Sequence, residues 1–211
     1  GEQLSGSGAS PAHDGSGAGG DVAEGLDTRE YSLMEHLGDL RDRLMRAAIG
    51  VFIVSIGAFA VSRDVLELLK QPVVKAAESL GTVPRFIVIA PAEYFIAQLK
   101  AAVVVGIFLS MPWTLYQLWL FVAPGLYKKE RRYVLVFVWA GAFFFLAGGA
   151  FAYFGAFPGM FKFFLEHTMG AGVEMTLSVA EHFSFSMKLL LAFGLVFQAP
   201  VIVFVLSMAG I

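Results

Sequence analysis

The sequence predicts an all-α protein, a polytopic membrane bundle of four transmembrane helices that follows a disordered N-terminal tail. Composition is the first reason: of the 211 residues, 57% are hydrophobic and only 15% are charged, and the mean hydropathy is +0.72. A soluble domain carries about 25% charged residues, and a globule of this size could not bury so much apolar surface. The second reason is that the apolar residues gather in four long stretches, each long enough to cross a bilayer.

Composition and motifs also exclude several classes of function. The net charge of −2 gives no basic surface for nucleic acid, and the absence of cysteine excludes disulfides, iron–sulfur ligation and thiol catalysis. No nucleophile–base arrangement and no phosphate-binding glycine loop is present. The histidines have no metal-ligand spacing; they are His13, His36, His167 and His182. We therefore expect no enzyme, no metal and no cofactor.

Residues 1–31 are rich in Gly, Ala and Ser with scattered acidic residues, and such a segment is expected to be disordered. The ordered domain, 32–211, is predicted to begin with a helix, because Ser32 and Glu35 have the spacing of a capping box. The first residue is Gly rather than Met, and the last ends an apolar run. We therefore expect the chain to be a piece of a longer protein.

The leucines that follow Ser32 recur at helical spacing and form one face of an amphipathic helix that continues into the first span. The expected spans are 44–62, 101–123, 133–157 and 189–211. Between them we expect a loop over 62–100, with a helical piece at 63–80 broken by Pro72, and a second loop over 158–186. In the third span Gly148, Ala152 and Ala156 lie four apart, a spacing that lets helices approach closely in lipid.

Positive charges predict the orientation in the membrane. Lys and Arg are dense just before the first span and in the short second connection, and sparse in the two longer connections: the dense sets are Arg41, Arg43 and Arg46, and Lys128, Lys129, Arg131 and Arg132. Lys and Arg in short loops stay on the cytoplasmic side. The N-terminus is therefore predicted to be cytoplasmic.

Two carboxylates lie on that predicted cytoplasmic side. Glu130 sits among basic residues, which either simply neutralise it or leave it to receive a positively charged ligand, since a carboxylate accepts the two parallel hydrogen bonds of an arginine. Asp39 has the same two interpretations, the simpler being an i,i+4 ion pair with Arg43. Together, the two acids could meet two adjacent arginines.

Polar residues and prolines interrupt the spans. Gln117 and Gln198 either hydrogen-bond a neighbouring helix of the same chain or contact a partner subunit. Pro112 and Pro200 are expected to kink their helices and free backbone carbonyls. Broken helices also mark substrate sites in transporters, so a fragment of a small-solute transporter is the alternative function. A subunit that only holds partner helices is a third.

Several stretches resemble one known family. Residues 35–44 read Glu-His-Leu-Gly-Asp-Leu-Arg-Asp-Arg-Leu, and residues 112–132 read Pro-Trp-Thr-Leu-Tyr-Gln-Leu-Trp-Leu-Phe-Val-Ala-Pro-Gly-Leu-Tyr-Lys-Lys-Glu-Arg-Arg. The first is similar to the N-terminal signature of the TatC family, the multispanning subunit of the twin-arginine protein translocase. The second is similar to its second span and first cytoplasmic loop. With matches at 149–154, 157–158 and 192–200, the resemblance covers about 32–211.

The resemblance implies a non-enzymatic receptor and core of protein export in the bacterial inner membrane. Members of the family bind twin-arginine signal peptides of folded precursors at the cytoplasmic face. They assemble with small single-span subunits of the TatA and TatB type into an oligomeric complex driven by the proton-motive force. By this resemblance Glu130 matches the signal-binding glutamate, Phe121 and Lys128 match neighbours in that site, and Asp39 stands where the family often has Glu.

The chain also departs from the family pattern. Gln198 stands at a fourth-span position where relatives often carry Glu, at the contact with the small subunits, and an amide cannot ionise there. Pro72 matches a proline of the first external loop. The family usually has six spans, whereas this sequence ends after the fourth.

Overall fold

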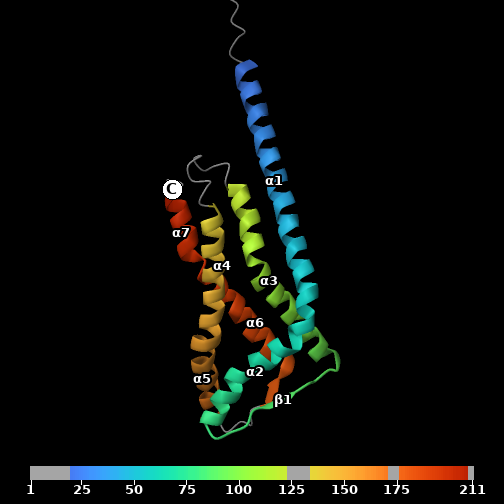
Figure 1. The fold of residues 1–211 in the computed structure, drawn as a ribbon, viewed down its shortest axis with the longest axis vertical. Coiled ribbons are helices and arrows are strands. Elements are labelled where there is room, and N and C mark those ends of the chain that lie inside the picture. Colours follow the sequence, from blue (N-terminus) through green and yellow to red (C-terminus); the bar gives the residue numbers. More distant parts are fainter. Residues whose placement is uncertain (1–19, 123–133, 171–175, 209–211) are drawn as a thin grey trace, which may run out of the picture. The chain divides into compact units, whose positions relative to one another are not determined.

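The computed structural model of the chain describes residues 20–122, 134–170 and 176–208. It divides into two units, Gly1–Arg41 and Asp42–Ile211, and the packing described below is that of the second. The elements, in order, are α1 (Gly20–Ala58), a single 3-10 turn η1 (Phe59–Val61), α2 (Ser62–Ser79), β1 (Arg85–Ile87), α3 (Ala92–Val122), α4 (Val134–Phe151), the π turn η4 (Ala152–Ala156), α5 (Phe157–Gly170), β2 (Thr176–Ser178), α6 (Val179–Val196) and α7 (Ala199–Met208) (Figure 1).

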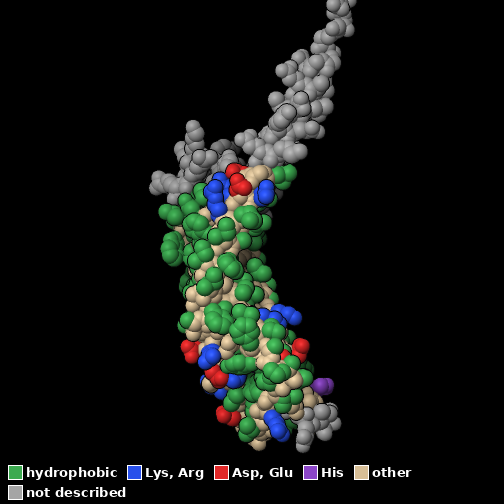
Figure 2. Space-filling model, turned by 90° about the vertical axis from the view of Figure 1, so that its right-hand side faces the viewer, with side chains coloured by type: hydrophobic (Ala, Val, Ile, Leu, Met, Phe, Trp, Pro, Cys, Tyr) green, Lys and Arg blue, Asp and Glu red, His purple; other side chains and the backbone are tan. Residues whose placement is uncertain are grey.

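Four helical stretches of the described chain are long and apolar enough to cross a membrane, which confirms the predicted number of spans. They are Leu37–Ser79, Ala92–Phe121, Val134–Gly170 and Val179–Phe204. Large side chains such as Phe143, 68% exposed, and Trp139, 67% exposed, point outward from α4, as expected where the solvent is lipid. On the face shown in Figure 2, hydrophobic side chains cover the middle of the helices and charged side chains gather toward the ends.

The N-terminal helix is longer than the sequence analysis predicts. α1 begins at Gly20, so Ser32 lies inside the helix and not at its start. Once a helix is nucleated, each added residue gains a backbone hydrogen bond. Residues 20–31 contain no proline, and residues 26–31 contain no glycine either. Residues 1–19 lie outside the described residues, and their disorder stays a prediction.

The second predicted loop, 158–186, is wrong in its first half, because helix α5 occupies Phe157–Gly170. It is also wrong over its last eight residues, because α6 begins at Val179. Phe157, Phe161 and Leu165 lie four residues apart, are buried, and join the core cluster that also contains α2 residues. Pro158 is tolerated because it is the second residue of α5 and follows the wider turn η4, where the regular hydrogen-bond ladder is already interrupted.

Two short strands add to the all-α architecture. β1 and β2 pair in parallel, with Phe86 opposite Leu177. They join the connection between α2 and α3 to the connection between α5 and α6. Three residues each are too few to show a period-2 pattern in the sequence, so the pairing could not be predicted.

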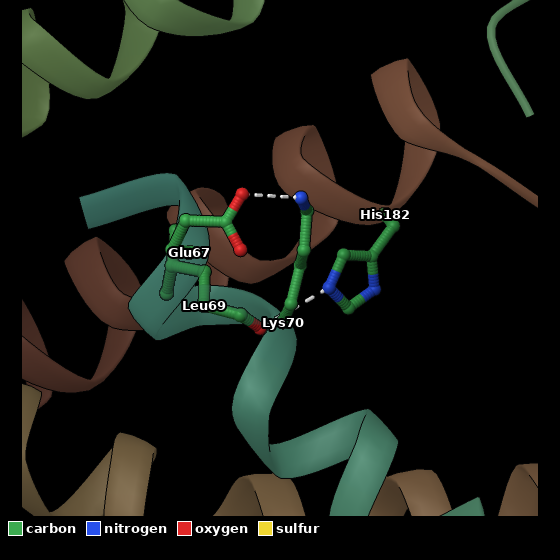
Figure 3. Close-up of polar contacts among 4 residues, drawn as sticks. All are labelled: Glu67, Leu69, Lys70 and His182. Atoms are coloured by element: carbon green, nitrogen blue, oxygen red, sulfur yellow. Dashed lines mark hydrogen bonds and ion pairs between the residues drawn. The ribbon is translucent and has the colours of Figure 1, made fainter. Parts of the chain in front are cut away.

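Helix α2 continues through Pro72, where the sequence analysis predicts a break. Proline has no N–H, so the carbonyl of Leu68, four residues earlier, lacks its helical donor. The hydroxyl of Tyr153 in η4 donates to that carbonyl at 3.0 Å. One residue on, Nε2 of His182 in α6 donates to the carbonyl of Leu69 at 3.2 Å, beside the Lys70–Glu67 ion pair (Figure 3).

Helices α3, α4 and α6 pack against one another across the membrane-spanning part (Figure 1). The backbones of α4 and α6 approach closely at Gly148, where an added Cβ would lie 2.5 Å from the carbonyl oxygen of Phe193 and 2.9 Å from Cα of Gly194. Only a residue without a side chain fits there. The small-residue spacing of the third span therefore does bring two helices together, α4 and α6.

The role of Tyr153 can be tested with a double-mutant cycle. Tyr153→Phe removes the donor and leaves the Leu68 carbonyl unsatisfied, so we expect the free energy of unfolding to fall by about 1 kcal/mol. In a Pro72→Ala background, the N–H of the new residue supplies the missing donor, so the same change is expected to cost much less. Thermal unfolding of the purified protein in detergent measures both; equal losses in the two backgrounds would contradict the role given to Tyr153.

Candidate functional site

The residues predicted to bind a signal peptide are only partly described. Glu130 and Lys128 lie outside the described residues. Asp39 is exposed on α1 and belongs to the first unit, and Phe121 is half-buried in the last turn of α3. The grouping of these four residues into one site therefore stays a prediction.

Gln198 lies in the turn that separates α6 from α7. Its side chain is 5% exposed, and Nε2 donates a hydrogen bond of 2.8 Å to the carbonyl of Gly141 in α4. The helix break falls just before Pro200, the second residue of α7, a position near a helix start that proline favours. Of the two interpretations of Gln198, the hydrogen bond within the chain is present, and a contact with a partner subunit stays a prediction.

Gln117 is equally buried, 4% exposed, in the C-terminal half of α3. Within the described part of the chain, its Oε1 is buried without a hydrogen-bond partner, and so is Oγ1 of Thr114 one turn earlier. Met111, Leu115 and Trp119 of the same helix belong to a buried apolar cluster. A buried acceptor without a donor costs about 1–3 kcal/mol, so this face of α3 has unused hydrogen-bonding capacity.

Thr114 was not singled out by the sequence analysis, although its i,i+3 spacing to Gln117 places both on one helix face. Pro112 lies two residues before Thr114 inside an unbroken α3. Next to Thr114, Nε1 of Trp113 donates to the carbonyl of Arg46 at 3.2 Å and ties α3 to α1. Among the described residues, no group of three His, Asp or Glu side chains could hold a metal ion.

These features define the class of the molecule: a polytopic α-helical membrane protein whose spans are held together by small residues and a few buried amides. The particular family follows from comparison with known proteins. The sequence model of the Sec-independent protein translocase protein (TatC) matches residues 35–211, and the chain belongs to the TatC family.

Individual relatives agree with this assignment. The chain is 37% identical over 177 residues to the Sec-independent protein translocase protein TatC of Desulforapulum autotrophicum, covering 84% of this chain and 64% of the relative. It is 36% identical over 179 residues to TatC of Escherichia coli K12, covering 85% of this chain and 68% of the relative. It thus spans less than two thirds of the length of the Desulforapulum protein.

The fold agrees as well. The crystal structure of a protein described as the twin arginine translocase receptor TatC superposes with a TM-score of 0.74 at 34% identity, covering 83% of this chain and 75% of that chain. The resemblance noted in the sequence is therefore confirmed at the level of family and fold, and it favours a protein translocase component over the transporter alternative.

Gln117 and Gln198 are expected to respond differently to substitution. Gln198→Leu removes the 2.8 Å hydrogen bond to Gly141 and should lower the free energy of unfolding by about 1 kcal/mol. Gln117→Leu replaces an acceptor that has no partner in the described chain, so stability of the isolated protein should stay the same or rise. Thermal unfolding in detergent compares the two variants, and a larger loss for Gln117→Leu would contradict this assignment.

Proposed function

We propose that the chain is the receptor and core subunit of a twin-arginine translocase, which binds the signal peptides of folded precursors without enzymatic activity. The observation that carries the proposal is the TatC family match over residues 35–211, which includes both predicted acidic positions. The described fold supports it, since its counterpart among solved structures is described as the twin arginine translocase receptor.

In this proposal Glu130 and Asp39 each accept the guanidinium of one signal-peptide arginine. A carboxylate and a guanidinium form two parallel charge-assisted hydrogen bonds, a geometry that lysine cannot reproduce. Phe121 supplies apolar surface beside Glu130, and Lys128 lies near it in the same connection. Asp is one methylene shorter than Glu, so position 39 keeps the charge with a shorter reach.

The site is proposed to face the cytoplasm of a bacterial cell with the protein in the inner membrane. The family assignment and the four apolar helices support a multi-pass inner-membrane protein. The N-terminus is placed on the cytoplasmic side by the Lys and Arg residues that precede the first span and crowd the second connection.

The receptor proposal is tested by photo-crosslinking. A twin-arginine signal peptide carrying a photoreactive group is added to inverted membrane vesicles that contain the protein in its translocase complex, with the cytoplasmic face outward. Glu130→Ala and Asp39→Ala should each lower the crosslinked fraction at limiting peptide by roughly tenfold or more, because a charge-assisted hydrogen bond is lost.

Glu166→Ala is the matched control, because Glu166 is an exposed acid paired with Lys162 on α5 and should leave crosslinking unchanged. A peptide with two lysines in place of the arginines should crosslink weakly to every variant. Wild-type crosslinking by both acidic variants would refute the site. Equal crosslinking in right-side-out vesicles would refute the orientation.

We further propose that the small single-span subunits of the complex dock where α3 has unused acceptors. Oε1 of Gln117 and Oγ1 of Thr114 are buried in the isolated chain, so in this proposal each accepts a hydrogen bond from a polar side chain of a partner helix once the side chains that cover it move aside. Gln198 is the second proposed contact, through the Oε1 atom that its bond to Gly141 leaves available. Because spans cannot gain stability from hydrophobic burial against lipid, such polar contacts select the partner.

Co-purification with the small subunits tests this docking proposal. Gln117→Leu should reduce the partner retained after detergent extraction by roughly threefold to tenfold, although it leaves the stability of the isolated chain unchanged. Gln98→Leu is the control, since Gln98 is also buried on α3 but is 19 positions away. Undiminished retention in Gln117→Leu would argue against the contact.

A further inference from the structure

An apolar groove lies between α3 and α6, and two lysines rim it. The groove has a volume of about 360 Å³. Leu99 and Val103 line it on α3, Met187 and Leu191 line it on α6, and Lys100 and Lys188 stand one on each helix. Two helices that are far apart in the sequence thus contribute the same pair of features, an apolar wall and an ammonium group.

The two ammonium groups differ from those of Lys70 and Lys162, which have carboxylate partners. Lys70 is 2.6 Å from Glu67, and Lys162 is 3.9 Å from Glu166. Across residues 42–122, 134–170 and 176–208, by contrast, no carboxylate lies within ion-pair distance of Lys100 or Lys188. Lys100 instead donates to the hydroxyl of Ser184 at 3.0 Å. Ser184 lies one turn before Lys188 and also lines the groove.

The lysines also share a level relative to the membrane. Lys100 directly precedes the span predicted at 101–123, and Lys188 directly precedes the one predicted at 189–211. α3 and α6 therefore enter the bilayer from the same side, each just after a lysine. Lysines at helix ends extend their ammonium groups toward the lipid headgroups. The groove continues from there toward Val104 and Leu191, which lie inside the two predicted spans.

We propose that this groove binds one anionic phospholipid. The phosphate lies between Lys100 and Lys188 and accepts a hydrogen bond from the Ser184 hydroxyl, and an acyl chain lies along the groove. The ligand matches both features of the site, because only a lipid presents a negative headgroup and an apolar chain at these two depths. A zwitterionic lipid fits less well, since its own cation offsets the phosphate charge.

A transmembrane helix of another protein is a poorer occupant of the same groove. Its backbone would have to displace the two ammonium groups from the headgroup region or bury them without a counter-charge, and an unpaired charge in the hydrocarbon is costly. The lipid phosphate meets both amines where they already are. The inference does not depend on the translocase function, because it rests only on α3 and α6.

Spin-labelled lipids test the proposal directly. The complex is reconstituted in nanodiscs, and electron paramagnetic resonance gives the motionally restricted fraction of phosphatidylglycerol relative to phosphatidylcholine. Lys100→Gln with Lys188→Gln should lower this preference by about fivefold for each lysine, the value of one basic residue at an anionic surface. The double Arg variant of the same positions should keep it.

The matched control is Lys70→Gln with Lys162→Gln, which removes the same charge from lysines that already have carboxylate partners. It should keep the wild-type preference. An unchanged preference in the Lys100/Lys188 variant would overturn the proposal, and so would an equal fall in the control, since general surface charge would then explain the binding.

A third variant tests the groove separately from the charges. Val103→Trp fills the groove and keeps both lysines, so the restricted lipid fraction should fall although the charge is unchanged. Val103 is 48% exposed, so the bulkier side chain should not prevent folding. Full lipid restriction in this variant would overturn the acyl-chain site. Displacement of the labelled lipid by inorganic phosphate alone would show an anion site without lipid and would also overturn it.

Discussion

The arrangement of the helices outside the membrane depends on how the backbone carbonyls around Pro72 are satisfied. A carbonyl that has lost its helical donor must find another or remain unpaired in a low-dielectric setting. Tyr153 and His182 come from different helices and reach adjacent carbonyls on one turn of α2. The defect at Pro72 is thus converted into one directional contact with η4, and the bond from His182 to the neighbouring Leu69 carbonyl fixes α2 to the start of α6 as well. The buried residues Leu66, Leu69 and Val73 then pack the same helix from its apolar face.

This constraint explains why the sequence could predict the spans better than the segments that connect them. Spans depend on composition alone, since lipid requires about 20 apolar residues whatever their order. The helical continuation beyond Phe157 depends instead on α2, which supplies the surface against which Phe161 and Leu165 are buried. The unbroken α2 depends on Tyr153, more than 80 residues away. Neither a break at Pro72 nor a loop after Pro158 could be ruled out without these partners.

The candidate site residues also divide into features that the sequence could predict and contacts that depend on distant parts of the chain. Gln117 and Gln198 could be recognised because a polar residue in an apolar span is conspicuous in any sequence. Which of them is satisfied could not be read from the sequence, since the answer depends on whether a backbone carbonyl of α4 comes within reach. The carbonyl of Gly141 comes within reach of Gln198 because Pro200 ends α6 just before it and turns the amide toward α4. Gln117 lies in an unbroken helix among apolar neighbours, where no donor of the described chain meets its oxygen.

Polar contacts are therefore distributed unevenly along the bundle. At the end that carries α2 and α5, Tyr153, His182 and the Lys100–Ser184 bond connect separate elements, and Gln198 connects α6 and α7 to α4 further along. Toward the other end of α3, Thr114 and Gln117 have acceptors without donors. Because lipid gives no hydrophobic drive for helix association, such directional bonds matter at both ends, and the bond from Trp113 to the carbonyl of Arg46 ties α3 to α1 beside Thr114. The buried acceptors of Thr114 and Gln117 lie next to this bond and add nothing to the stability of the described chain.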